Sequence, residues 1–79
     1  MNIPDILELI MQEYTRASSK FGPFSSPHEG IGIIREEYLE LEKEVFKRIR
    51  TRELMLPEAI QLGAMAVRFI FDLCNDREP

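Results

Sequence analysis

The sequence predicts an all-α domain of three helices, forming a bundle that is completed by association with further copies of the chain. Apolar residues recur at three- and four-residue spacing, and no strand-like alternation persists. Proline, glycine and serine gather in residues 18–27, and a weaker joint covers residues 50–57, so three helical segments are separated. A single domain of 79 residues buries only about 60% of its unfolded surface, which leaves a lone copy marginally stable.

The first helix is expected over roughly residues 3–18. Pro4 is tolerated in a first helical turn, and the apolar stripe of this segment consists of Ile3, Ile6, Leu7, Ile10 and Tyr14. Acidic residues interrupt the apolar run and no basic lead-in precedes it. We therefore expect no signal peptide here.

The second helix has a clear start signal. Ser26 is the expected N-cap, Pro27 occupies the first helical position, and Glu29 follows three residues after the serine. This pattern is typical of a capping box with proline in its preferred place. The helix is expected to continue to about Ile49, and its buried line is predicted to be Ile34, Tyr38, Leu41, Val45 and Ile49.

The third helix is expected from Pro57 to near Asn75 and is apolar on nearly every side. Its apolar residues include Ile60, Leu62, Ala64, Val67, Phe69, Ile70, Phe71 and Leu73. A helix that is apolar all round is a buried helix. Two other helices cannot surround it completely, so we expect it to pack against another subunit in a homodimer or homotetramer.

Composition excludes several classes of partner. The net charge is −4, with the acidic excess in residues 29–44, so a nucleic-acid partner is not expected. No run approaches the roughly 18 uninterrupted apolar residues of a membrane span, so no membrane partner is expected. Cys74 is the only cysteine and is expected to be a small buried apolar residue, which suits a reducing compartment. The predicted localisation is cytoplasmic.

The glutamates of the second helix allow two interpretations. Glu37, Glu40 and Glu44 fall within an arc of roughly 60° at the edge of the apolar stripe, where they repel one another unless something positive lies between them. In one interpretation the positive charge is a divalent cation. In the other, the interleaved basic residues neutralise the acids as surface pairs, and these residues are Arg35, Lys43, Lys47 and Arg48.

The third helix carries one polar line, made of Glu58, Gln61, Arg68 and Asp72. A buried polar group without a partner costs about 1–3 kcal/mol, so each needs a role. Arg68 and Asp72 could pair at four-residue spacing, and Glu58 could face the positive end of the helix dipole. Alternatively, acids from the second and third helices make a four-oxygen cluster that suits Mg²⁺ or Mn²⁺. With a single histidine in the chain, zinc and di-iron fit poorly.

The segment HEGIGIIREEYLELEKEV, followed by PEAIQLGAMAVRFIFDL, resembles the MazG-like nucleotide pyrophosphohydrolases, over roughly residues 20–73. The signature of that family is EExxE on one helix and ExxD on the next. Residues 36–40 match the first motif in full, and residues 58–61 match the second except that Gln61 replaces the aspartate. The resemblance implies a single all-α domain over residues 1–79, completed by dimerisation.

The resemblance also implies an activity, namely Mg²⁺-dependent hydrolysis of a nucleoside triphosphate to the monophosphate and pyrophosphate. Carried over by position, Glu37, Glu40, Glu58 and Gln61 are the expected metal ligands, and Glu36 and Glu37 are the expected catalytic residues, with Glu36 as a further ligand or the group that orients the water. Gln61 removes one negative charge, and the chain is shorter than expected for the family. The alternative is therefore a catalytically degenerate helical module that binds a nucleotide or a protein.

The expected substrate-binding residues are Lys20, Phe21, Phe24, His28 and Arg68. The two phenylalanines could stack on a base, with Lys20 or His28 contacting phosphate or base. Alternatively, the phenylalanines cap the end of the bundle and His28 lies exposed in a first helical turn. Gly30 and Gly32 are expected where another helix or the ligand approaches closely.

Overall fold

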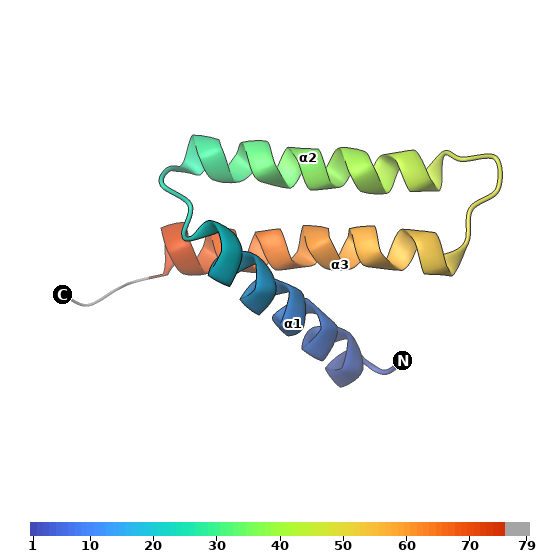
Figure 1. Ribbon diagram of the computed structural model, residues 1–79, viewed down its shortest axis with the longest axis horizontal. Helices are drawn as coiled ribbons and strands as arrows, with labels where there is room; N and C mark the ends of the chain where they lie inside the picture. Colours follow the sequence, from blue (N-terminus) through green and yellow to red (C-terminus); the bar gives the residue numbers. More distant parts are fainter. Residues whose placement is uncertain (76–79) are drawn as a thin grey trace.

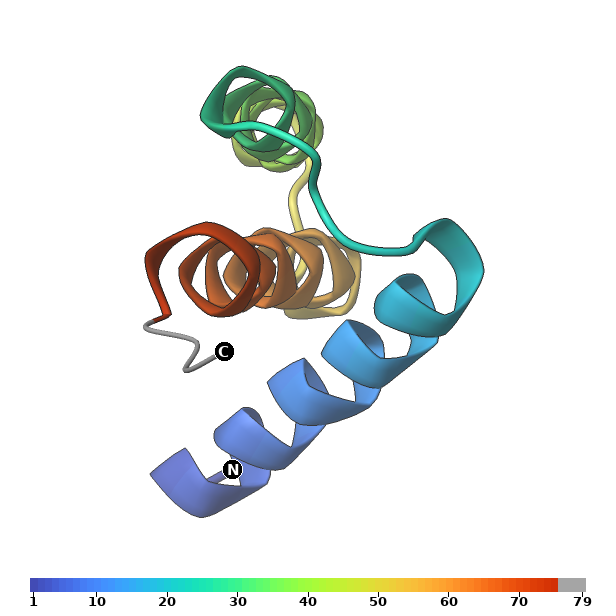
Figure 2. The same cartoon turned by 90° about the vertical axis from the view of Figure 1, so that its left-hand side faces the viewer.

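The computed structural model of the chain describes residues 1–75, and these residues form helices without strands. The elements are α1 (Ile3–Phe21), α2 (Pro27–Val45) and α3 (Arg52–Phe69), and α3 continues into a π-helical turn, η1 (Ile70–Cys74). Figures 1 and 2 show α2 and α3 as an antiparallel hairpin, with α1 crossing α3 obliquely on a different side. The all-α fold class predicted from the sequence is confirmed, with α3 as the central element.

The start of α1 is fixed by a complete capping box that involves Asn2. Its Oδ1 accepts from the Asp5 backbone N–H at 2.9 Å, and the Asp5 carboxylate accepts from the Asn2 N–H at 3.4 Å. The helix runs three residues beyond the expected end at Ser18 and stops at Gly22, whose φ of 73° favours glycine.

The predicted start of α2 is confirmed in part. Ser26 Oγ accepts from the Glu29 N–H at 3.1 Å, but the Glu29 carboxylate accepts from the Ser25 N–H at 2.9 Å instead of returning to Ser26. The capping box is therefore displaced by one residue on its carboxylate side. The helix ends at Val45, before the expected Ile49.

The buried line predicted for α2 is correct only for its inner members. Ile34, Leu41 and Val45 are half-buried, whereas Tyr38 and Ile49 are 51% and 77% exposed. Ile49 fails because it lies in the loop after α2, so helical spacing no longer places it on the inner side.

The predicted start of α3 at Pro57 is wrong by five residues. Thr51 is the N-cap, because its side chain accepts from the Leu54 N–H at 3.3 Å, and Pro57 lies inside the helix. Proline removes one backbone hydrogen bond within the helix. The first turn, capped by Thr51, forms before the position of that missing bond. The proline therefore does not mark the helix boundary.

The core lies where α3 meets the other two helices. Its buried members are Ala17, Phe24, Ala64 and Met65, with Ile10, Tyr14, Ile33, Ile34, Phe69 and Leu73 packed against them. Gly30 permits the closest approach, because a Cβ there would lie 2.7 Å from Phe69 Cδ2. The expected close approach is confirmed for Gly30. It is not found at Gly32, where an added Cβ meets nothing within 4 Å.

The third helix is not buried on all sides within one copy. Of its residues, Ala64, Met65 and Arg68 are buried, whereas Leu54, Ile70 and Phe71 are exposed. Cys74, expected to be buried, is exposed at the end of η1. By length and composition alone, Arg52–Cys74 could cross a membrane, a weak signal that core helices of soluble proteins also give.

The two glycines of α2 provide a matched test of this packing. We expect Gly30→Ala to lower the free energy of unfolding by up to about 2 kcal/mol, because overpacking against Phe69 costs about 1–3 kcal/mol and is offset by the roughly 1 kcal/mol gained from helix propensity. Gly32→Ala should raise it by about 0.5–1 kcal/mol. Urea denaturation of both variants measures the difference, and equal stabilisation by both would contradict the close approach.

Candidate functional site

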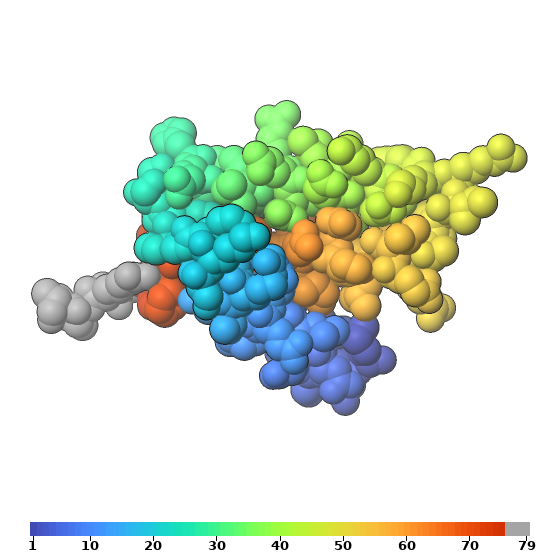
Figure 3. All heavy atoms as spheres, in the orientation of Figure 1, coloured from blue at the N-terminus to red at the C-terminus, as the bar shows by residue number. Residues whose placement is uncertain are grey.

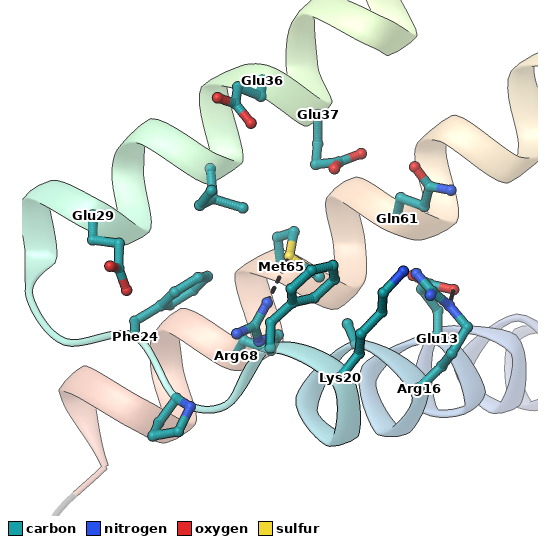
Figure 4. Close-up of a pocket in the computed structure, with 14 residues that line it drawn as sticks. Glu13, Arg16, Lys20, Phe24, Glu29, Glu36, Glu37, Gln61, Met65 and Arg68 are labelled. Atoms are coloured by element: carbon teal, nitrogen blue, oxygen red, sulfur yellow. Dashed lines mark hydrogen bonds and ion pairs between the residues drawn. The ribbon is translucent and has the colours of Figure 1, made fainter.

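A cavity of about 500 Å³ lies between the three helices and the linker that joins α1 to α2. Figure 3 shows the linker and the end of α1, in cyan, lying against α2 and in front of α3. Figure 4 draws the lining residues. They are Glu13, Arg16, Ala17, Lys20, Phe21, Pro23, Phe24, Glu29, Ile33, Glu36, Glu37, Gln61, Met65 and Arg68.

Most of the residues expected to form a site line this cavity. From the expected catalytic and metal-binding set it contains Glu36, Glu37 and Gln61; from the expected substrate-binding set, Lys20, Phe21, Phe24 and Arg68. Glu40, Glu58 and His28 do not line it. His28 is exposed in the first turn of α2, which matches the alternative interpretation of this residue.

Arg68 of α3 anchors the linker that joins α1 to α2. Its side chain is buried, its Nη2 donates to the carbonyl of Gly22, and its Nη1 contacts Met65 Sδ at 3.3 Å. The guanidinium also lies 4.2 Å from the centre of the Phe24 ring, a cation–π arrangement. Its Nε is buried without a hydrogen-bond partner. One buried cation thus holds the segment that closes the cavity.

Asp72 fixes the same segment from η1. Its Oδ2 accepts from the Phe24 backbone N–H at 2.9 Å. Arg68 and Asp72 therefore both bond to the linker. Their four-residue spacing, which suggested a mutual pair, places both side chains on the side of the helix that faces the linker.

The two phenylalanines have different environments. Phe24 is buried in the core, and Arg68 covers one face of its ring. Phe21 is 64% exposed at the cavity rim, with Lys20 Nζ 5.2 Å from the ring centre. Phe24 therefore behaves as the alternative interpretation expected, closing the end of the bundle, and Phe21 is the ring with an available face.

The acidic residues of α2 divide into two groups. Glu40 and Glu44 make surface pairs with Lys43 at 3.7 Å and Lys47 at 2.8 Å, so neutralisation by interleaved lysines holds for these two acids. Glu37 differs, because its Oε2 is buried without a hydrogen-bond partner. Glu44 Oε2 is likewise buried and unbonded, although the other oxygen of that carboxylate is paired.

Glu37 is the carboxyl group of the cavity whose pKa is raised. Burial raises its pKa above the ordinary value of 4.5, and the neighbouring carboxylates raise it further, Glu58 most and then Glu40, Glu13 and Glu36. Glu40 and Glu58 therefore lie near enough to act on Glu37 although they do not line the cavity. A positive charge placed beside Glu37 would relieve this repulsion.

The donor set around Glu37 suits a hard cation, because it consists of carboxylate and amide oxygens, one of them without a partner. As the side chains stand, residues 1–75 contain no group of three or more His, Cys, Asp or Glu side chains that could hold a metal ion. The charges of Glu58 and Glu40 act on Glu37, but these side chains do not come together as a ligand group in this arrangement.

Several lining residues were missed from the sequence, chiefly Glu13 and Arg16 of α1. Arg16 donates to both carboxylate oxygens of Glu13, at 2.9 and 2.6 Å, which lowers the pKa of Glu13. The spacing of Glu13, Arg16 and Lys20 is i, i+3, i+7, so a helical wheel already places the three on one side of α1. This spacing could have been read from the sequence, but it does not show which part of the molecule that side of α1 faces.

Comparison with known proteins adds no identification. No protein-family model matches the chain, and neither a curated protein nor a solved structure shows significant similarity to it. The resemblance to MazG-like enzymes therefore depends on the motifs alone.

The raised pKa of Glu37 predicts a pH-dependent stability difference. Its ionised form is less favourable in the folded than in the unfolded chain. The destabilisation is therefore absent below about pH 4.5, grows as the pH rises from there through the raised pKa of the folded chain, and is constant above it. We expect Glu37→Gln to raise the melting temperature at pH 7 and to have no such effect at pH 4. The exposed Glu8→Gln is the matched control, and a gain at pH 4 as large as at pH 7 would contradict the assignment.

Proposed function

We propose that this protein is a Mg²⁺-dependent nucleoside triphosphate pyrophosphohydrolase of the MazG-like type. The observation that carries the proposal is the composition of the cavity. Carboxylates from α2 and an amide from α3 line it together with cations from α1 and α3 and an exposed aromatic ring. A nucleotide with its metal ion has the matching parts, namely a cation, a polyanion and a flat base.

The roles of the residues follow from their positions. Glu37 and Gln61 line the cavity and would hold Mg²⁺ with Glu40 and Glu58, whose charges already act on Glu37. When bound, Mg²⁺ supplies charge neutralisation at the phosphates and lowers the pKa of bound water. Glu36, the neighbouring cavity carboxylate, would orient the attacking water and take its proton. Manganese could replace magnesium.

The substrate would enter beside the linker. Phe21 offers its exposed ring to the base, and Lys20, directly before it in the chain, would contact phosphate. Arg68 would contribute positive potential from the α3 side of the cavity, where its buried Nε has no hydrogen-bond partner. His28 is exposed outside the cavity wall, so any contact with the substrate would require the ligand to extend over the start of α2.

The active form is proposed to be a homodimer or homotetramer in the cytoplasm. Among residues 1–75 of one copy, thirteen large apolar side chains are exposed, which include Ile3, Leu7 and Met11 along one side of α1. These three lie at four-residue spacing, so they form a continuous apolar stripe next to the side that packs on α3. Covering such a stripe would add the buried apolar area that a chain this small lacks.

Gln61 favours a second candidate function, a nucleotide-binding or protein-binding module without turnover. It lines the cavity at the position where the resembling family has an aspartate. An amide oxygen can coordinate Mg²⁺ but brings no charge, which weakens the affinity for the metal.

Turnover distinguishes the two candidates. We expect purified protein with Mg²⁺ to release pyrophosphate and monophosphate from at least one canonical or modified nucleoside triphosphate. Glu37→Gln should abolish the release, and Gln61→Asp should increase it, because a fourth carboxylate strengthens metal binding. If wild type and Gln61→Asp are folded and inactive on every nucleotide, the enzyme proposal is wrong.

The oligomer is tested separately, by size-exclusion chromatography with light scattering. We expect wild type to have the mass of a dimer or tetramer and Leu7→Lys/Met11→Lys to shift toward the monomer, because a charge on the apolar stripe costs several kcal/mol when buried. Glu8→Lys, on the same helix, is the control for added charge. A monomeric wild type would exclude this assembly.

A further inference from the structure

The cavity has a basic wall on α1 that the assigned roles leave partly unused. Arg16 and Lys20 lie one turn apart on the side of α1 that lines the cavity, and Figure 4 shows both side chains extending toward the side where Glu37 and Gln61 lie. Lys20 makes no ion pair within 4.0 Å among the described residues. Two cations therefore face a wall of carboxylates across the cavity.

Arg16 is held in place by Glu13. The pair is bidentate, and the carboxylate is the more buried member, with 15% of its side chain exposed against 55% for the arginine. The Nη1 of Arg16 makes no hydrogen bond within the described part of the chain. Glu13 and Arg16 also line a second cavity of about 420 Å³ between α1 and α3, so the pair stands at the border between the two.

We propose that Arg16 binds the terminal phosphates of the ligand, and that Glu13 holds the guanidinium at the cavity rim until the ligand replaces the carboxylate. The inference deepens the proposed function, on which it rests for the identity of the anion. A guanidinium binds carboxylate and phosphate through the same two-pronged geometry, so one anion can substitute for the other without reorienting the arginine.

The electrostatics of the cavity favour this exchange once a cation accompanies the phosphate. Without one, Arg16 is attracted by Glu13 and also by Glu37 across the cavity. A cation beside Glu37 takes over the neutralisation of that carboxylate. The remaining attraction on Arg16 is its bidentate pair with Glu13, in which the arginine side chain is 55% exposed, so solvent and salt screen its charge. A phosphate with several charges is then the stronger partner.

The test is a double-mutant cycle on binding by the full chain. Isothermal titration calorimetry with inorganic tripolyphosphate and Mg²⁺ measures the affinity of wild type, Arg16→Gln, Glu13→Gln and the double variant. We expect Arg16→Gln to bind about 10- to 100-fold more weakly, since a hydrogen-bonded charge is lost. Glu13→Gln should bind about two- to fivefold more tightly, because the competing carboxylate is gone. In the Arg16→Gln background the gain from Glu13→Gln should vanish.

The control is Arg48→Gln, which removes an exposed charge from the loop between α2 and α3, at the opposite end of the hairpin from the linker. It should change the affinity by no more than about twofold at physiological salt. Circular dichroism verifies that each variant is folded. Equal weakening by Arg16→Gln and Arg48→Gln, an undiminished gain from Glu13→Gln without Arg16, or no binding of tripolyphosphate by wild type would each overturn the proposal.

The outcome is separable from that of the proposed function. If no nucleoside triphosphate is hydrolysed but the tripolyphosphate cycle gives the expected pattern, Arg16 is a phosphate-binding residue and the enzyme proposal alone fails. If hydrolysis occurs and Arg16→Gln leaves KM unchanged, the enzyme proposal stands and the role of Arg16 is refuted.

Discussion

The geometry of the cavity depends on the burial of one cation, Arg68. The residue is 3% exposed, yet none of the ion pairs found within residues 1–75 includes it. Burying a charge costs several kcal/mol unless other polar groups compensate. Here the compensation comes from the Gly22 carbonyl and the Phe24 ring, both in the linker. The linker is therefore held to α3, and with it the end of α1, the start of α2 and the wall of the cavity.

The cavity places charges where stability alone would not place them. Glu37 is partly buried with an unpaired oxygen and four acidic neighbours that raise its pKa, although a neutral side chain of similar size would fit the same space. Sites of this kind lower the stability of a fold, and they are expected where a ligand supplies the missing charge. Arg16 and Lys20 of α1 and Arg68 of α3 line the same cavity, so its walls carry charges of both signs.

Local signals in the sequence predicted the helices, but not where each contact would form. Ser26 and Pro27 gave the start of α2, because a cap is decided by neighbouring residues. Pro57 misled the prediction of α3, since proline marks a first turn only when no better cap precedes it, and Thr51 does. The spacing of Arg68 and Asp72 suggested a mutual pair, whereas both reach the linker, 46 and 48 residues away. Contacts of that separation are set by how the helices cross. Glu36 and Gln61 could be proposed as site residues because they belong to sequence motifs. Arg16 belongs to no motif, and its place in the cavity depends on how α1 crosses α3.

The central helix links the site to the assembly. One side of α3 presents Gln61, Met65 and Arg68 to the cavity, while Gly63 and Ala64 let α1 approach closely, with Ile10 Cδ1 3.2 Å from where a Cβ on Gly63 would lie. Leu54 of α3 and Ile70 and Phe71 of η1 stay exposed in one copy, so burial within that copy does not fix every side of this helix. Any partner that covers them would lie against the same continuous helix that carries Arg68. Association would therefore place the partner on the helix that supplies Gln61, Met65 and Arg68 to the cavity, even if the partner contributes no residue to the cavity itself.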